Sequence, residues 1–426
     1  MAALAAVTSF TTALIAIQLA VIVGLVVLVW SLKRRGRARL QVGHDGELMP
    51  SLVALTHGAL VPGNSVQLLE NGEGYFEVLF DELARARTTI HFETFLWKKG
   101  ELSHRLSMEL ARRAREGVTV RVLLDGSGSR KADPEDLRAM RDAGCRLKHF
   151  HPIRVTNLGR INQRDHRKIA VFDGRVGLIG GHCIVDAWRG DARVAGEVRD
   201  LSARVEGPVV AQLQAAFCEG WIEETGEVTA GEGVFPVLEP CGGAAAHLAY
   251  ITPQGKPSSL KLLHLLAFRM ARKQILIQNP YFLPDPDGIE ALRDAVQRGV
   301  RARLMVPSAQ ASDNALVQHA SHRRFRVLID AGIEVYEYHR NLLHQKTLTV
   351  DGTWSAIGSA NFDDRSFEIN EEATLGILDP GFARELEEVF ERDLVHARRI
   401  QPEAWSRRGR LHKLGDAAAW LLKEQL

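Results

Sequence analysis

The chain of 426 residues is long enough to bury the cores of two domains, and 46% of its residues are hydrophobic. Its formal net charge of +2 gives no general attraction to nucleic acid. The four cysteines lie far apart and form no Cys-x-x-Cys pair, which argues against a structural zinc site and a disulfide framework. We therefore expect reduced thiols in a cytosolic protein.

The N-terminus differs from the rest of the chain. Residues 13–30 are apolar apart from Gln18, and a helix of this length spans roughly 27 Å, close to the hydrocarbon thickness of a bilayer. Trp30 suits the membrane interface, and five basic residues follow it over 33–39, whereas no Lys or Arg precedes the apolar stretch. A cleaved signal peptide, the alternative, would carry its charges before that stretch. The sequence thus predicts a membrane anchor over 1–40, followed by cytoplasmic domains.

A glycine- and proline-rich connector is expected over 41–65. Alternating helical and strand patterns follow and predict an α/β domain. The expected elements are a helix after Gly72, a strand over 88–97, a helix around 102–110, a strand over 118–124, a helix over 134–142 and a strand over 145–150.

The same order of elements returns in the second half of the chain. The expected elements are a helix over 260–270, a strand over 274–282, a helix capped by Asp287, a strand over 300–306 and a helix over 314–330. This repetition predicts one α/β unit duplicated. We place the domains at 66–230 and 247–400, with a linker over 231–246. The basic, amphipathic segment 401–426 either lies on the membrane surface or packs on the protein.

One short pattern, His-x-Lys-x-x-x-x-Asp, occurs in each half, at 166–173 and 344–351. Each copy is expected on a strand that runs into an Asp-Gly turn. Because side chains alternate along a strand, His166 and Lys168 share a face, and so do His344 and Lys346.

Asp173 and Asp351 are five residues beyond their lysines, and alternation places them on the opposite face. We assign both aspartates structural roles at the turns.

Two histidines and two lysines that converge between the halves suit phosphoryl chemistry. One imidazole attacks phosphorus, the other protonates the leaving oxygen, and the lysines bind the phosphate oxygens. The residues expected to support this chemistry are Ser359 and Asn361 near the phosphate, Glu372 as the partner of His344, and Asp200 as the partner of His166. No carboxylate cluster suggests a metal, and no cofactor is expected.

The sequence resembles the phospholipase D superfamily, and most of all the bacterial cardiolipin synthases. The two motifs carry the resemblance, together with the segments 358–366 and 370–372, Arg199-Asp200 and residues 205–208. The resemblance implies two α/β domains related by a pseudo-twofold axis, a covalent phosphatidyl-histidine intermediate and no metal. By the family pattern, His166 is the nucleophile and His344 the general acid and base.

One position departs from that pattern. Cys183 stands where the family usually has Asn and where the second half has Asn361. A thiol cannot supply the hydrogen bonds of an amide, so phosphate stabilisation is expected to depend on the second half. We interpret Cys183 as a buried structural thiol.

These observations predict a phosphatidyltransferase in the bacterial inner membrane, with its catalytic domains in the cytoplasm. It would condense two phosphatidylglycerols, which are anionic phospholipids, to cardiolipin and glycerol. The alternatives are a phospholipase D-type hydrolase, a transphosphatidylase with another acceptor, a membrane-tethered nuclease and a non-catalytic scaffold. The near-neutral charge and 7% aromatic content give the nuclease little support, and no nucleic-acid partner is expected.

Overall fold

The computed structural model describes residues 17, 18, 21, 24, 40, 48–56, 58–152, 162–251, 258–409, 415, 416, 419 and 420. The chain divides into two units, Met1–Gly43 and His44–Leu426. The apolar stretch over 13–30 of the anchor predicted at 1–40 lies outside the described residues except at four positions. Among the described residues, no helix combines the length and apolar character needed to cross a membrane.

The unit from residue 44 onward is α/β, and its two halves repeat one order of elements. The strands of the first half are β1 (Val61–Glu70), β2 (Thr89–Thr94), β3 (Thr119–Asp125), β4 (Arg146–Phe150), β5 (Ile169–Phe172), β6 (Val176–Gly180), β7 (Val198–Arg199) and β8 (Leu201–Glu206). Its helices are α2 (Met49–Leu55), α3 (Asn71–Arg85), α4 (Glu101–Arg115), α5 (Pro134–Asp142), the short 3₁₀ helix η2 (Asp186–Trp188) and α6 (Val210–Thr225).

The second half follows with the corresponding elements. Its strands are β9 (Ala244–Ile251), β10 (Gln274–Gln278), β11 (Arg301–Pro307), β12 (Glu334–Tyr338), β13 (Leu342–Leu343), β14 (Thr347–Val350), β15 (Trp354–Gly358), β16 (Glu372–Leu378) and β17 (Ala397–Arg399). Its helices are α7 (Ser259–Met270), α8 (Pro286–Gln297), α9 (Ala315–Asp330), α10 (Asp364–Glu368), α11 (Pro380–Leu394) and α12 (Pro402–Ser406).

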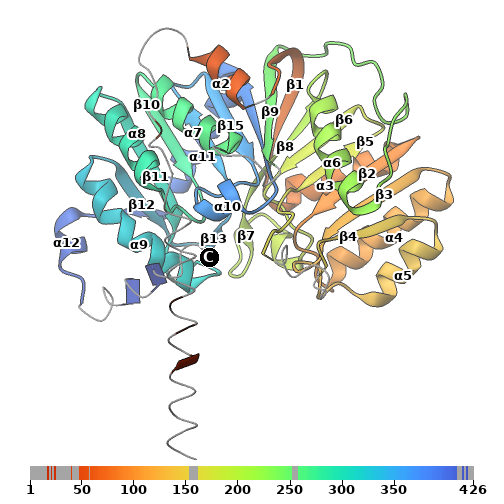
Figure 1. Ribbon diagram of the computed structural model, residues 1–426, viewed down its shortest axis with the longest axis horizontal. Helices are drawn as coiled ribbons and strands as arrows, with labels where there is room; N and C mark the ends of the chain where they lie inside the picture. Colours follow the sequence, from red (N-terminus) through yellow and green to blue (C-terminus); the bar gives the residue numbers. More distant parts are fainter. Residues whose placement is uncertain are drawn as a thin grey trace, which may run out of the picture. The chain divides into compact units, whose positions relative to one another are not determined.

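The sheet shows the duplication directly. The strand order is β4-β3-β2-β5-β6-β8-β1 in the first half and β12-β11-β10-β14-β15-β16-β9 in the second. In each half, the first three strands are parallel and the others antiparallel. Strands β1 and β9 pair antiparallel and join the halves into one sheet, with α4 and α5 at one end and α8 and α9 at the other (Figure 1).

The two halves also share a core. Strands β2, β5, β14 and β15 are buried along their whole length, as expected for strands covered by helices on both faces. Helix α6 contacts β9 of the other half as well as its own strands, and α11 likewise contacts β1. Val210 and Leu213 of α6 belong to the same buried cluster as Leu386 and Val389 of α11. The predicted pair of α/β units is therefore confirmed, but the units are fused through a common core.

Four predicted boundaries need correction. The connector over 41–65 contains α2 and the start of β1, and the linker over 231–246 runs into β9. The expected strand over 88–97 ends at Thr94. The cap of α8 is Asp285, whose Oδ1 accepts a hydrogen bond from the Gly288 N–H at 2.9 Å, and not Asp287. Pro286 fixes this start because proline suits the first helical position.

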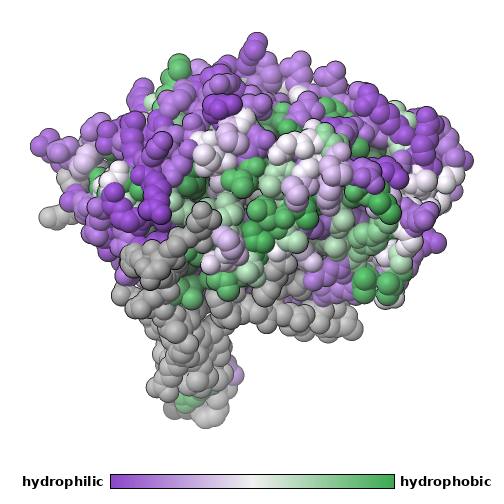
Figure 2. All heavy atoms as spheres, turned by 90° about the horizontal axis from the view of Figure 1, so that it is seen from above, coloured by the Kyte–Doolittle hydropathy of each residue, from purple (hydrophilic) through white to green (hydrophobic). Residues whose placement is uncertain are grey.

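The described part of the C-terminal segment packs on the protein. The buried Trp405 ring lies 5.1 Å from the His322 ring and 5.5 Å from the Phe325 ring, both on α9. Asp416 accepts a hydrogen bond from Arg408 at 2.9 Å, and Ala419 is buried against α9. Of the two expectations for this segment, these contacts favour packing. Elsewhere the described surface in Figure 2 is largely hydrophilic, and hydrophobic residues gather near the middle and lower right of the face shown.

Candidate active site

The two motifs meet between the halves. His166 and His344 stand just before β5 and β14, and each is bound to the backbone of the other half. The His166 N–H donates to the carbonyl oxygen of Glu371 at 2.9 Å, and the His344 N–H donates to that of Arg199 at 2.8 Å. The short parallel pair β7–β13 lies alongside, near the centre of Figure 1. The convergence expected from the repeat is therefore present in the structure.

Each histidine is paired with a carboxylate of the other half. His166 Nδ1 lies 2.9 Å from Glu372 Oε1, and His344 Nδ1 lies 2.7 Å from Asp200 Oδ2. The pairing predicted from the sequence, Glu372 with His344 and Asp200 with His166, was wrong. The reason is the backbone pairing across the halves, which places Glu371 beside His166 and Arg199 beside His344, so that the next residue of each segment faces the histidine.

The carboxylates fix the form of both imidazoles. An ionised carboxylate only accepts hydrogen bonds, so each histidine carries its proton on Nδ1 and leaves Nε2 unprotonated. Burial, together with Lys168 and Lys346, lowers the pKa of His166 to about 4 against the influence of Glu372. Burial and Lys346 also lower the pKa of His344, against Asp200. Both rings are therefore neutral near pH 7, with an unprotonated Nε2.

The two carboxylates stay ionised although they are buried. Burial acts to raise the pKa of Glu372, but His166 and Lys168 outweigh it and hold that pKa below its usual range. For Asp200, His344 and its hydrogen bond likewise outweigh burial and hold the pKa well below its usual range. Each carboxylate thus keeps a negative charge with which to orient its histidine.

Both lysines lie beside the histidines, and both are buried. Lys168 Nζ donates to the His166 carbonyl oxygen at 2.6 Å, and Lys346 Nζ lies 2.5 Å from that of His344 and 3.0 Å from His344 Nε2. Burial and the charge of Lys168 lower the pKa of Lys346 to about 8. Two buried ammonium groups that repel each other suit an anion, because a bound phosphate would offset their repulsion.

The two motif aspartates lie at the turns after β5 and β14, with φ of 53° and 55°. The Asp173 carboxylate accepts hydrogen bonds from the backbone N–H groups of residues 87–89, and Asp351 accepts from those of residues 272–274. Each carboxylate ties its turn to the segment that enters the neighbouring strand, β2 or β10. These contacts support the structural roles assigned to both residues.

The residues that follow β6 and β15 differ between the halves. Ser359 Oγ donates to Glu372 Oε2 at 2.5 Å, so it supports the carboxylate in addition to any contact with phosphate. Asn361 Oδ1 is buried and has no hydrogen-bond partner among the described residues. In the first half, Cys183 is fully buried, and its thiol donates to the Gly181 carbonyl oxygen at 3.6 Å. Burial raises the pKa of Cys183, which agrees with a structural thiol.

Several residues of the site were not found by sequence reasoning. Phe95 packs edge-on against the His166 ring at 4.9 Å, and Trp188 packs edge-on against the His344 ring at 5.1 Å. Arg167, inside the first motif, is fully buried, and its guanidinium lies 3.4 Å from Glu371 and 3.0 Å from Glu219. The repeat carried a signal for one of them, because Trp188 follows His166 by 22 residues, just as Ser366 follows His344.

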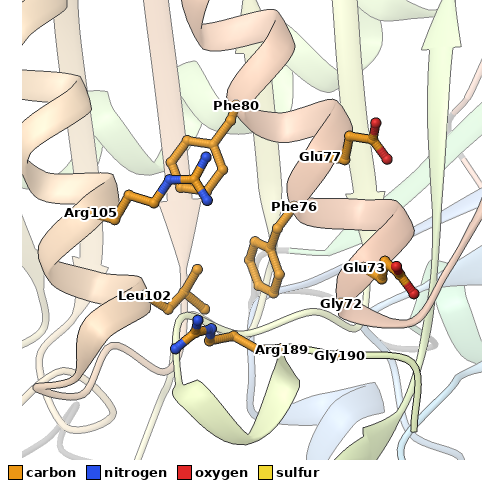
Figure 3. Close-up of a pocket in the computed structure, with 9 residues that line it drawn as sticks. All are labelled: Gly72, Glu73, Phe76, Glu77, Phe80, Leu102, Arg105, Arg189 and Gly190. Carbon is orange, nitrogen blue, oxygen red and sulfur yellow. The ribbon is translucent and has the colours of Figure 1, made fainter.

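A separate pocket of about 320 Å³ lies between α3 and α4. Phe76, Phe80 and Leu102 form its apolar wall, with Arg105 and Arg189 at its edge (Figure 3). None of its lining residues belongs to the two motifs. The histidine site is therefore distinct from this pocket.

Fold and site together define a class: a duplicated α/β protein in which two His-Lys motifs meet between the halves. Residues 79–186 and 265–394 match the family described as "Cardiolipin synthase, PLD-like domain". The chain is 36% identical to cardiolipin synthase A of Pseudomonas putida over 360 residues, which cover 84% of this chain and 74% of that protein. It is 31% identical to a cardiolipin synthase of Listeria monocytogenes, over 87% of this chain and 77% of that protein.

A solved structure has the same fold. The crystal structure of phosphatidylserine synthase from Haemophilus influenzae superposes with a TM-score of 0.65 at 14% identity, over 88% of this chain and 98% of that one. The family model and the relatives at 36% and 31% identity show that the chain belongs to the cardiolipin synthase family of phospholipase D-like proteins, and that it is a phosphatidyltransferase of the phospholipase D type.

Proposed function

We propose that this protein condenses two molecules of phosphatidylglycerol to cardiolipin and glycerol. The observation that carries the proposal is the pair of buried histidines, each held by a carboxylate of the opposite half and flanked by a lysine. Two such rings on either side of one phosphate suit a double displacement, in which a covalent intermediate forms and is then resolved.

In the first step, Nε2 of His166 attacks the phosphorus of one phosphatidylglycerol. The bond from phosphorus to the glycerol oxygen breaks, and His344 gives that oxygen a proton from its own Nε2. Binding of the anionic phosphate between Lys168 and Lys346 raises the pKa of His344 and favours the protonated ring that this step needs. The products are a phosphatidyl-histidine and free glycerol.

In the second step, the terminal glycerol hydroxyl of another phosphatidylglycerol attacks the phosphatidyl-histidine. His344, now neutral, takes the hydroxyl proton, the bond from phosphorus to His166 breaks, and cardiolipin leaves. Lys168, Lys346 and the Asn361 amide stabilise the charge on the non-bridging oxygens in both transition states. The reaction needs no metal in this scheme.

We also propose that the protein is a single-pass protein of the bacterial inner membrane with its catalytic halves in the cytoplasm. The apolar stretch over 13–30 and the basic residues after it support this location. An anchor keeps the site beside its lipid substrates, and the basic flank favours an anionic leaflet.

The test is to incubate the purified, detergent-solubilised protein with labelled phosphatidylglycerol in EDTA and to follow products by mass spectrometry. We expect cardiolipin and glycerol from the wild type, and neither from His166→Ala or His344→Ala. Phosphatidic acid alone would make the protein a hydrolase. A phosphatidyl ester of an added alcohol, formed in preference to cardiolipin, would assign it another acceptor.

A further inference from the structure

The two carboxylates that orient the histidines are supported by different side chains. Glu372 accepts hydrogen bonds from Ser359 Oγ at 2.5 Å and from Ser366 Oγ at 2.8 Å. Asp200 Oδ2 accepts from the indole N–H of Trp188 at 2.8 Å, in addition to the bond from His344. Because Trp188 and Ser366 lie the same distance after their motif histidines, one position of the repeat performs the same task with two unlike side chains.

The position that Ser359 occupies in the second half has no space for a side chain in the first half. Gly181 directly follows β6, as Ser359 directly follows β15. A Cβ added at Gly181 would lie 2.1 Å from Asp200 Oδ1, so the position has no room for a serine. The Leu201 N–H donates to Oδ1 at 2.8 Å. In the described part of the chain, the side chains that donate hydrogen bonds to Asp200 are thus those of His344 and Trp188.

Trp188 contacts both members of the His344–Asp200 pair. Its N–H reaches the same carboxylate oxygen as His344 Nδ1, and its ring meets the imidazole at 5.1 Å with an interplanar angle of 88°. The side chain is buried, so this hydrogen bond does not compete with bulk water. A change at Trp188 therefore affects the orientation of His344 through two contacts.

The segment that carries Trp188 is fixed from two sides. Asp186 accepts hydrogen bonds from the N–H groups of Glu101 and Leu102, at 3.0 and 2.8 Å, at the start of α4. On the other side, Gly72 of α3 lies so close that an added Cβ would stand 1.7 Å from the Trp188 carbonyl oxygen. Gly72 and Leu102 also line the pocket of Figure 3, which is bounded on this side by Arg189 and Gly190.

We propose that Trp188 is a positioning residue that holds Asp200, and through it His344, in the geometry needed for general acid and base catalysis. This inference rests on the proposed function, because it assigns the proton transfers to His344. Trp188 acts on the leaving and attacking oxygens only through His344. Its loss should therefore matter most where the leaving oxygen needs a proton.

The test compares two donors with different leaving groups. Glycerol leaves phosphatidylglycerol only with a proton, whereas p-nitrophenolate leaves the p-nitrophenyl ester of phosphatidic acid without one. Trp188→Phe keeps the ring but removes the N–H. We expect it to slow phosphatidylglycerol turnover about 10- to 100-fold, in keeping with the loss of a hydrogen bond to a charged group. The single-turnover burst of nitrophenolate should slow less than about threefold.

Two further variants show whether Trp188 acts through Asp200. In an Asp200→Asn background, Trp188→Phe should slow phosphatidylglycerol turnover by less than about twofold, because residues that act as a unit are not additive. Trp188→His keeps a ring N–H and should retain more of the rate than Trp188→Phe. A melting temperature equal to that of the wild type would show that the slower turnover of a variant does not come from unfolding.

The matched control is Trp221→Phe. Trp221 is buried in α6, and its indole N–H also donates to a carboxylate, that of Glu227, at 3.1 Å and outside the site. This variant should leave turnover of both donors unchanged. Equal slowing of both donors by Trp188→Phe, or of neither, would overturn the inference. A wild type that turns over neither donor would instead refute the proposed function, and a nitrophenolate burst that persists in His166→Ala would refute the assignment of His166 as its nucleophile.

Discussion

Glu372 lies 2.9 Å from His166 although 206 residues separate them in the chain. The reciprocal pair, Asp200 and His344, is 144 residues apart. Each half therefore supplies the carboxylate that the histidine of the other half needs, and neither half contains a complete pair. The duplicated fold forms one site with two unequal sides.

The crossed pairing predicts opposite behaviour for two conservative variants. Glu372→Gln removes the charge that orients His166, so the nitrophenolate burst, which reports attack by His166, should fall about 100-fold. Asp200→Asn acts on His344, so it should spare that burst and slow phosphatidylglycerol turnover by a similar factor. Single-turnover kinetics with both donors makes the comparison. The reverse pattern would show that each carboxylate serves the histidine of its own half.

The pKa values of the site predict a broad pH optimum. His166 must be neutral to attack, and its pKa is lowered to about 4, so activity should persist in mild acid and fall as the pH drops through about 4. Lys346, with its pKa lowered to about 8, loses its charge as the pH rises through that value, which weakens phosphate binding. A plot of kcat/KM against pH for the p-nitrophenyl donor, whose leaving group needs no proton from His344, reports the free enzyme and should show both limbs.

The matching variant for the alkaline limb is Lys346→Arg. Arginine stays charged at every pH of the assay, so this variant should lose the limb near pH 8 whatever its absolute rate. An alkaline limb that stays at the same pH in Lys346→Arg would mean that another group causes it.

Arg167 is predicted to stabilise the junction between the halves. Besides Glu371 and Glu219, its guanidinium donates to the carbonyl oxygens of Ala216 at 2.8 Å and Ile251 at 3.0 Å. Arg167→Gln, which inserts the residue found at the same place in the second motif, removes the buried positive charge and the contacts that its guanidinium makes with both halves. We expect it to lower the free energy of unfolding by about 3 kcal/mol, measured by urea denaturation.

Arg112→Gln is the control for this prediction. It removes ion pairs with Glu109 and Glu116 on the surface of α4, and such pairs contribute little. The midpoint of urea denaturation of Arg112→Gln should equal that of the wild type. Equal midpoints for Arg167→Gln and the wild type would show that the buried guanidinium is not needed for stability.

The difference between Asn361 and Cys183, which stand at corresponding positions of the two halves, predicts that their alanine variants lose activity to different extents. Asn361→Ala removes an amide whose buried Oδ1 has no partner in the described structure, and kcat should fall about 10- to 100-fold through loss of oxyanion stabilisation. Cys183→Ala changes the corresponding position of the first half, and kcat should stay within about threefold. Steady-state kinetics of the two variants tests this, and a larger loss in Cys183→Ala would contradict it.

Much of the fold follows from local patterns in the sequence. The helix over 134–142 starts at Pro134 because Asp133 caps it, and both residues can be recognised from the sequence alone. The strands appear as short, apolar, β-branched runs because they are buried on both faces. The repeat then brings the two His-Lys pairs to one place.

The carboxylate partners could not be assigned in this way. Asp200 and Glu372 each stand close after a motif in sequence, and sequence spacing contains no information about which half a strand end will face. That choice is made by the β7–β13 pair and by the bridge between Asp165 and Glu371, both of which are contacts between halves. Trp188 was missed for a related reason, since its counterpart Ser366 is unlike it in everything except its hydrogen bond.

The most direct test of the central claim is to trap the covalent intermediate. His344→Ala, mixed with the p-nitrophenyl ester of phosphatidic acid, should form the phosphatidyl-enzyme without an acid and then lack the base that resolves it. Quenching under alkaline conditions and peptide mass spectrometry should find the phosphatidyl group on His166 and none in His166→Ala. A phosphatidyl group on His344 of His166→Ala, with none on His166 of His344→Ala, would reverse the two roles. If neither variant carries a phosphatidyl group on a histidine while the wild type turns over its substrate, the covalent mechanism is contradicted.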